Sequence, residues 1–280
     1  MALTVNTNVT SLNVQKNLNR ASDALSTSMT RLSSGLKINS AKDDAAGLQI
    51  ATRMTSQIRG QTMAIKNAND GISIAQTAEG AMQEQTNILQ RMRELAVQSR
   101  NSSNSDTDRD ALNTEFAQMS DELTRIANST QLNGKDLLKA ATTMTFQVGS
   151  NTGPENQIDI KLADLTAATL SVDSGSIAIS GDDTAIQAAF LGAVDAIDAA
   201  LKTINTTRAD LGAAQNRLTS TISNLQNINE NASAALGRVQ DTDFAAETAQ
   251  LTKQQTLQQA STAILAQANQ LPSAVLKLLQ

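Results

Sequence analysis

The sequence predicts a mainly α protein, a long antiparallel helical coiled-coil bundle with paired terminal helices and a small β-hairpin region. Three observations lead to this fold class. Apolar residues recur at spacings of three and four along most of the chain, as in amphipathic helices that pack lengthwise. Between about residues 140 and 184 the apolar period changes to two, which is typical of strands. Both ends carry similar apolar stripes and little charge, so we expect them to pair with each other and with other copies.

The first helix is expected from about Val5 to Ser34 and ends at Gly35, because Gly commonly follows a helix C-terminus. No charged side chain precedes Lys16. The apolar stripe of this helix needs a facing helix to bury it. Its residues are Val5, Val9, Leu12, Leu18, Ala21, Leu25, Met29, Leu32 and Leu36.

A second, long helix is expected from about Ala41 to Arg100, with Ser40 as its N-cap. Asp43 completes a capping box, and Asp44 adds negative charge at the positive end of the helix. A metal site at this carboxylate pair is the alternative, but no third ligand lies nearby in the sequence. Interior glycines weaken the helix by about 1 kcal/mol each relative to Ala, and they also allow a neighbouring helix to approach closely. They are Gly60, Gly71 and Gly80.

A polar loop at residues 101–106 leads to a short amphipathic helix of about 23 residues, and Asn133-Gly134 marks a turn. Alternating runs at residues 144–148 and 158–162 flank a loop with Gly and Pro and predict a β-hairpin. Weaker alternation indicates further β structure. It lies at Leu170–Val172 and Ile177–Ile179.

Helix returns near Asp183 with a heptad stripe that continues for about six repeats. Its polar positions, Arg208, Gln215 and Asn229, are interpreted as fixing register rather than as a site. A break is expected at Gly237. The last helix follows residues 241–243 and runs to Gln280, with Pro272 as a kink or local end. Its apolar stripe consists of Leu257, Ala260, Ile264, Ala268, Leu271, Val275 and Leu278.

Three domains are expected from this order. Residues 1–40 plus 240–280 form a terminal coiled-coil domain, the inner core. Residues 41–140 plus 183–239 form a helical bundle domain, and residues 141–182 form a small β-hairpin region within it. The two long helices are expected to pack antiparallel, with the β region at their far end.

Composition excludes most site chemistry. The chain has no His and no Cys, so the usual general base, most zinc sites and thiol nucleophiles are absent. A Ser-Lys or paired-carboxylate enzyme is an option in principle, but we expect no enzyme, cofactor or metal. A net charge of −5 and 1% aromatics argue against nucleic-acid binding. No stretch approaches the roughly 18 apolar residues of a membrane span, and a cleaved signal peptide is not expected.

Several segments in the two halves of the chain form a multi-part sequence signature. The N-terminal half carries RLSSGLKINSAKDDAAGL at residues 31–48, NANDGISIAQTAEG at 67–80 and LQRMRELAVQ at 89–98. The C-terminal half carries LGAAQNRL at 211–218 and QANQLP at 267–272. Together these segments resemble bacterial flagellin, and the resemblance covers about residues 1–140 and 185–280. One departure is the stretch Leu236-Gly237-Arg238, where the family usually has a Ser before the Arg.

This resemblance implies a structural subunit that polymerises into the flagellar filament for swimming motility, in a short form lacking the large outer variable domains. It implies export of the unfolded chain without a cleaved signal peptide, and an extracellular, secreted location in the filament. The partners it implies are other copies, the flagellar export chaperone and export apparatus, and the filament cap and junction proteins. The zinc peptidase that some members carry is excluded because His is absent.

Two hypotheses concern assembly. The terminal stripes are expected to be largely disordered in the free subunit and to order on polymerisation. The C-terminal helix is expected to line a central channel with Gln254, Gln258, Gln267 and Gln270, or alternatively to turn these residues toward neighbouring subunits. The expected polymerisation residues are Val5, Val9, Leu12, Leu18, Leu25, Leu32, Leu36, Leu257, Ile264, Leu271, Val275 and Leu278.

The resemblance also implies recognition by host receptors. A patch for Toll-like receptor 5 would consist of Gln90, Arg91, Leu95 and Glu115. Subunit packing is the alternative role and is favoured for Leu95; the resemblance implies both uses, at different times. A segment for the export chaperone and cytosolic NAIP receptors would consist of Val275, Leu276, Leu278 and Leu279. Rival functions are a hook–filament junction protein and a non-polymerising secreted coiled-coil protein.

Overall fold

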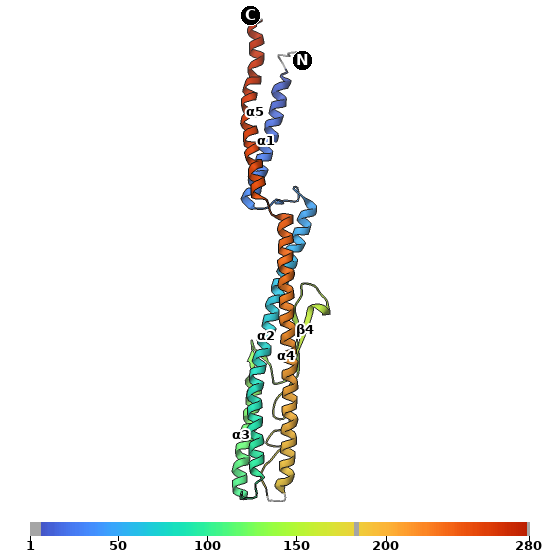
Figure 1. Ribbon diagram of the computed structural model, residues 1–280, viewed down its shortest axis with the longest axis vertical. Coiled ribbons are helices and arrows are strands. Elements are labelled where there is room, and N and C mark those ends of the chain that lie inside the picture. Colours follow the sequence, from blue (N-terminus) through green and yellow to red (C-terminus); the bar gives the residue numbers. More distant parts are fainter. Residues whose placement is uncertain (1–6, 182–184, 279–280) are drawn as a thin grey trace. The chain divides into compact units, whose positions relative to one another are not determined.

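The computed structural model describes residues 7–181 and 185–278, and the side chains of the last helix as far as residue 270. Figure 1 shows its helices and strands, which confirm the mainly α prediction. They are α1 (Val9–Ser34), α2 (Ala45–Ser99), α3 (Asp106–Ser129), β1 (Gln131–Leu132), β2 (Lys135–Asp136), β3 (Thr142–Gln147), a 3-10 helix (Pro154–Asn156), β4 (Gln157–Leu162), α4 (Ala185–Gln240) and α5 (Phe244–Leu278).

The chain divides into two compact units. The first consists of Met1–Ile58 and Glu230–Gln280, and the second of Arg59–Asn229. The divisions fall within α2 and α4, so each of these helices contributes to both units. The domain boundaries expected near residues 40 and 240 stay a prediction.

In the second unit α2 and α4 run antiparallel, as three polar contacts establish. Thr62 accepts a hydrogen bond from Asn229 at 3.3 Å, Glu79 accepts one from Gln215 at 3.0 Å, and Arg93 pairs with Asp198 at 3.2 Å. From one contact to the next the residue number rises on α2 and falls on α4, as it must in an antiparallel pair. Arg208 also lies 3.9 Å from Glu79, so each polar position of the α4 stripe has a partner on α2.

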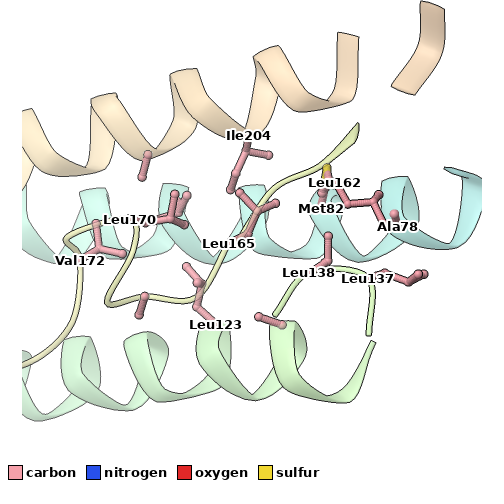
Figure 2. Packing of buried hydrophobic residues seen from close by; sticks show 14 of the residues in the cluster. Ala78, Met82, Leu123, Leu137, Leu138, Leu162, Leu165, Leu170, Val172 and Ile204 are labelled. Carbon is pink, nitrogen blue, oxygen red and sulfur yellow. The ribbon is translucent and has the colours of Figure 1, made fainter. Parts of the chain in front are cut away.

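The core of this unit contains a non-helical segment between the helices. Figure 2 shows Leu165, Leu170 and Val172 of this segment among side chains from α2, α3 and α4. Gln85 is fully buried and holds the segment by donating from Nε2 to the carbonyl of Leu165 at 3.0 Å. Strands predicted at Leu170–Val172 and Ile177–Ile179 are wrong. The alternation there arises because every second side chain enters the core, not because the backbone pairs.

The predicted β-hairpin is confirmed. β3 and β4 pair antiparallel, with Met144 opposite Ile160 and Phe146 opposite Ile158. Its expected place at the far end of the long helices is wrong, because Asn67, in the first half of α2, donates to the carbonyl of Gln147 at 3.0 Å. The turn predicted at Asn133-Gly134 connects β1 to β2, and both residues have positive φ, 50° and 72°.

The interior glycines of α2 differ in their surroundings. A Cβ added at Gly71 would lie 3.2 Å from Leu218 of α4 and 3.3 Å from Phe146 of β3, and one at Gly60 would lie 2.9 Å from Ser150. Close approach therefore explains these two. Nothing lies within 4 Å of a Cβ at Gly80, so close approach does not explain that glycine.

Helix ends depart from the predictions at several points. α2 begins at Ala45 and not at Ala41, because Asp43 accepts from the backbone N–H of Ser40 in a turn while Asp44 accepts from Gly47 at 2.9 Å. α4 continues through Gly237 to Gln240, and α5 continues through Pro272 to Leu278. Gly35 ends α1 as predicted, with φ 73°.

Candidate functional site

The first unit contains the two terminal helices, α1 and α5, which lie side by side and antiparallel (Figure 1). α1 begins at Val9, where Asn8 accepts a hydrogen bond from the N–H of Ser11 at 3.1 Å as the N-cap. α5 begins at Phe244, and Asp243 accepts from the N–H of Ala245 at 2.9 Å. The predicted pairing of the two ends is therefore present within a single chain.

The connections at the base of this pair are tied by backbone hydrogen bonds. Lys37 donates its N–H to the carbonyl of Gln240 at 2.7 Å, and Thr242 donates to the carbonyl of Gly35 at 3.0 Å. The segments between α1 and α2 and between α4 and α5 thus run antiparallel over a short distance. They fix where α1 ends and where α5 begins.

The pair leaves apolar side chains uncovered on both helices. Val9 and Leu12 of α1 are 58% and 57% exposed, and Leu257 and Ile264 of α5 are 45% and 50% exposed. Apolar side chains at these helical spacings form stripes that need a partner to leave water. The described part of the chain does not cover them.

The remaining predicted polymerisation residues are placed differently. Leu18, Leu25, Leu32 and Leu36 are half-buried in the single chain. Val5 and Leu279 lie outside the described residues. So do the side chains of Leu271, Val275, Leu276 and Leu278, whose backbone continues α5.

The glutamines predicted for a channel wall do not share one environment. Gln254 is buried and Gln258 is half-buried, while Gln267 and Gln270 are exposed. Gln254 is therefore not available to a channel in this chain. A channel role stays a prediction for the other three.

The predicted receptor patch is partly assembled on the second unit. Arg91 of α2 donates from Nη2 to Glu115 of α3 at 2.8 Å and from Nη1 to Glu94 at 3.0 Å. These hydrogen bonds raise the pKa of Arg91, the one from Glu115 most. Gln90 is exposed beside them, but Leu95 is fully buried. Leu95 contributes to the core, so the accessible members are Gln90, Arg91 and Glu115.

Carboxylates with lowered pKa values predict how stability depends on pH. Hydrogen bonds from Ser40 lower the pKa of Asp43, the Ser105 hydroxyl lowers that of Asp108, and Arg125 lowers that of Glu122. A lowered folded pKa contributes stability that is present above the unfolded pKa and is lost as pH falls through the folded one. Since the chain has no His, we expect a constant thermal midpoint between about pH 6 and 8, and a fall below about pH 4.

Circular dichroism melts across this pH range check the expectation. Asp108→Asn is the informative variant, because it removes at every pH the stability that the ionised Asp108 carboxylate contributes and that acid would otherwise remove. Its midpoint should therefore fall less than that of the parent on acidification. A midpoint that drifts between about pH 6 and 8 would contradict the assignment of pH dependence to carboxylates alone.

The described residues contain neither a cluster of metal-ligating side chains nor a membrane-spanning helix. No group of three or more His, Cys, Asp or Glu side chains in that part of the chain is arranged to hold a metal ion. None of the helices that the structure describes is long and apolar enough to cross a membrane.

Sequence reasoning missed the polar contacts between the terminal helices. Arg31 lies 3.7 Å from Glu247, and Ser11 donates to Asn269 at 2.8 Å. An Asn three residues before a Ser at the start of an apolar stripe is an N-cap signal that could have located the start of α1. No local signal pairs residues so distant in the sequence.

Comparison with known proteins gives a consistent result. The family model for the bacterial flagellin N-terminal helical region matches residues 5–143, and that for the C-terminal helical region matches residues 194–279. Flagellin A of Vibrio cholerae serotype O1 is 41% identical over 379 aligned residues, which cover 100% of both chains. Polar flagellin C of Vibrio parahaemolyticus is 40% identical over 385 residues, also with 100% of both covered. The crystal structure of Bacillus cereus flagellin aligns with a TM-score of 0.47 at 29% identity, covering 57% of this chain and 88% of that one.

Proposed function

The chain belongs to the bacterial flagellin family, and from this premise we propose that it assembles by burying the exposed apolar side chains of α1 and α5 against other copies of itself. Flagellins are structural proteins that form the flagellar filament, and this chain is a filament subunit. At 280 residues it is shorter than the alignments with its relatives, so it lacks a large variable domain between its two halves.

The observation that carries the proposal is the uncovered stripe on each terminal helix. Val9 and Leu12 on α1, and Leu257 and Ile264 on α5, remain about half exposed. No charged side chain lies between Lys253 and Lys277 to oppose burial. A neighbouring copy presents the same uncharged surface, and contacts that do not close into a ring generate an open filament.

Order in the terminal helices is proposed to depend on assembly. Burial of a Leu or Ile side chain contributes about 1.5–3 kcal/mol, while ordering the backbone costs about 1–2 kcal/mol per residue. The side chains that α1 and α5 bury fully against each other are small or polar, so pairing of these two helices alone gains little free energy against this cost. Contacts with several neighbouring copies supply the difference, so the free subunit is expected to have weakly ordered ends.

Seeded growth tests the proposal. The purified chain is incubated with and without short filament fragments and imaged by electron microscopy. Long uniform filaments that grow from the fragments are the expected result. A chain that stays monomeric or caps the fragments without extending them would instead be a junction protein or a secreted coiled-coil protein.

Further partners and the location are proposed on the family premise alone. They are the export chaperone and export apparatus, the filament cap and junction proteins, and an extracellular location in the filament after export without a cleaved signal peptide. Val275–Leu279 is proposed as the segment for the chaperone and for NAIP receptors. We also propose that the chain has no catalytic role, in keeping with its lack of His and Cys.

Recognition by Toll-like receptor 5 is proposed for Gln90, Arg91 and Glu115. Arg91→Ala removes the cation that joins α2 to α3 on this surface, and a central Arg contributes about 2 kcal/mol or more at many interfaces. We expect receptor activation by the monomer to fall by roughly tenfold or more. Arg125→Ala is the matched control, since Arg125 is another exposed Arg in an ion pair with a carboxylate. Equal activity of both variants would reject the patch.

A further inference from the structure

The seam between α1 and α5 has few large side chains that are fully enclosed, since Leu18, Leu25 and Leu32 of α1 are only half-buried. Its buried side chains are small or polar, namely Ala21 and Ser28 on α1 and Gln254 and Ala268 on α5. Large interlocking side chains normally fix the register of a coiled coil, and small ones leave alternative registers close in energy. A shift by one heptad would move one helix along the other by about 10 Å.

Polar contacts occur at both ends of this seam. At one end Asn8 donates from Nδ2 to the carbonyl of Ala268 at 2.7 Å, and Ser11 donates from Oγ to Asn269 Oδ1 at 2.8 Å. At the other end Arg31 Nη1 lies 3.7 Å from Glu247 Oε2. The contacts thus stand near the first and last turns of α1, with the small-residue seam between them.

We propose that Arg31 with Glu247, and Asn8 and Ser11 with the turn at residues 268–269, set the register in which α1 pairs with α5. The Glu247 side chain is only 13% exposed, so it depends on a cation. A shift by one heptad would put Ala24 at the position of Arg31 in one direction, and in the other it would carry the end of α1 at Ser34 past Glu247. Either shift leaves this carboxylate without its cation in a poorly hydrated place. The polar contacts therefore act, together with the backbone hydrogen bonds from Lys37 to Gln240 and from Thr242 to Gly35, against the slipped registers that the seam alone would permit.

The register has a consequence for assembly, and this consequence rests on the proposed function. It determines how far Val9 and Leu12 stand from Leu257 and Ile264 along the helix pair. A slipped copy would present these side chains about 10 Å out of place, and the next copy could not pack against them. Slipped copies are expected to stop growth at the filament end.

Engineered disulfides measure the register directly, because the chain has no Cys of its own. Ser28 lies about one turn before Arg31 and Leu251 about one turn after Glu247, so Ser28→Cys with Leu251→Cys reports the native register. Ser28→Cys with Gln258→Cys reports a shift by one heptad. Both pairs are oxidised in filaments and in the free chain, and the ratio of the two cross-linking rates is recorded.

In filaments whose chains carry no other substitution, the cysteine pair at positions 28 and 251 is expected to cross-link at least tenfold faster than the pair at positions 28 and 258. Glu247→Arg should raise the slipped-to-native ratio severalfold and shorten the filaments. Adding Arg31→Glu should restore most of the native ratio. It should not restore all of it, because Glu at position 31 would also face Asp43, whose pKa is lowered mainly by hydrogen bonds from Ser40 and also by Arg31. Lys253→Glu reverses an exposed charge on the same helix and should change nothing.

The inference would be overturned if Glu247→Arg left the slipped-to-native ratio of cross-linking rates unchanged. It would also be overturned if Arg31→Glu with Glu247→Arg did not bring that ratio back toward the native value. Failure of the proposed filament assembly can be distinguished from failure of the register inference. If the unchanged chain forms no filaments, the assembly proposal fails. The ratio of cross-linking rates in the free chain still reports which register α1 and α5 adopt whenever they pair, and so whether the polar contacts choose it.

Discussion

Replacing both Leu257 and Ile264 with Glu is expected to abolish seeded filament growth while leaving the stability of the free chain unchanged. Both side chains are about half exposed in the single chain, so a carboxylate there remains in water. In the filament the same positions are proposed to be buried. Loss of two apolar contacts costs about 3–6 kcal/mol, and burial of the charges adds to it. The critical concentration for growth should rise by a factor of at least about 100.

Light scattering after addition of filament fragments measures this growth. The matched control is Gln255→Glu with Thr262→Glu, which places two carboxylates seven residues apart at exposed polar positions of the same helix. The control should retain more growth than the test variant. Equal growth of the parent and of Leu257→Glu with Ile264→Glu would show that this stripe faces water in the filament.

Arg109→Met is expected to lower the free energy of unfolding of the second unit by about 3 kcal/mol. The Arg109 side chain is 2% exposed. Its Nε donates to the carbonyl of Ser99 at the end of α2, and its Nη1 donates to the carbonyl of Gly181 at 3.1 Å and lies 3.4 Å from Asp106 of α3. It therefore joins α2, α3 and the segment that leads toward α4. Met fills much of the space but leaves these carbonyls without their donor.

Urea unfolding followed by circular dichroism measures this loss. Arg125→Met is the control, since Arg125 makes an exposed ion pair within α3 and its removal should cost less than about 1 kcal/mol. A loss for Arg109→Met no larger than that of the control would mean that the three elements are held together by apolar packing alone.

Helical periodicity was sufficient to predict the long helices, because a stripe such as Phe116 to Leu123 in α3 records burial on one side of a helix. It was not sufficient for the ends of the helices. Ser40 and Asp43 match a capping box, yet they close a turn, and Asp44 caps α2 instead. α4 continues through Gly237 to Gln240, because one Gly weakens a helix without ending it.

The non-helical segment shows a second limit. Leu170 and Val172 alternate with an exposed Ser, as in a strand, but Ser171 has a positive φ of 55° and the segment makes turns. A period of two records which side chains reach the core, whatever the backbone does. Pairing of strands requires a neighbouring edge, and α2, α3 and α4 surround this segment instead (Figure 2).

The candidate site was predictable in part. The sequence indicated that the two ends pair and that their stripes need partners, because both properties follow from apolar spacing. The sequence did not indicate which stripe residues the pairing would cover. Val9 and Leu257 stay exposed because Ala21, Ser28, Gln254 and Ala268 occupy the seam. Packing was the favoured role for Leu95, but that its side chain is fully buried in the core could not be predicted from the sequence.

Hydrogen–deuterium exchange of the free subunit and of the assembled filament tests the central claim most directly. The claim is that assembly buries the uncovered stripes of α1 and α5. It predicts fast exchange near Leu12 and Ile264 in the free subunit and strong protection of the same amides in the filament, with the second unit protected in both states. Equal and strong protection of both terminal helices in the free subunit would contradict it.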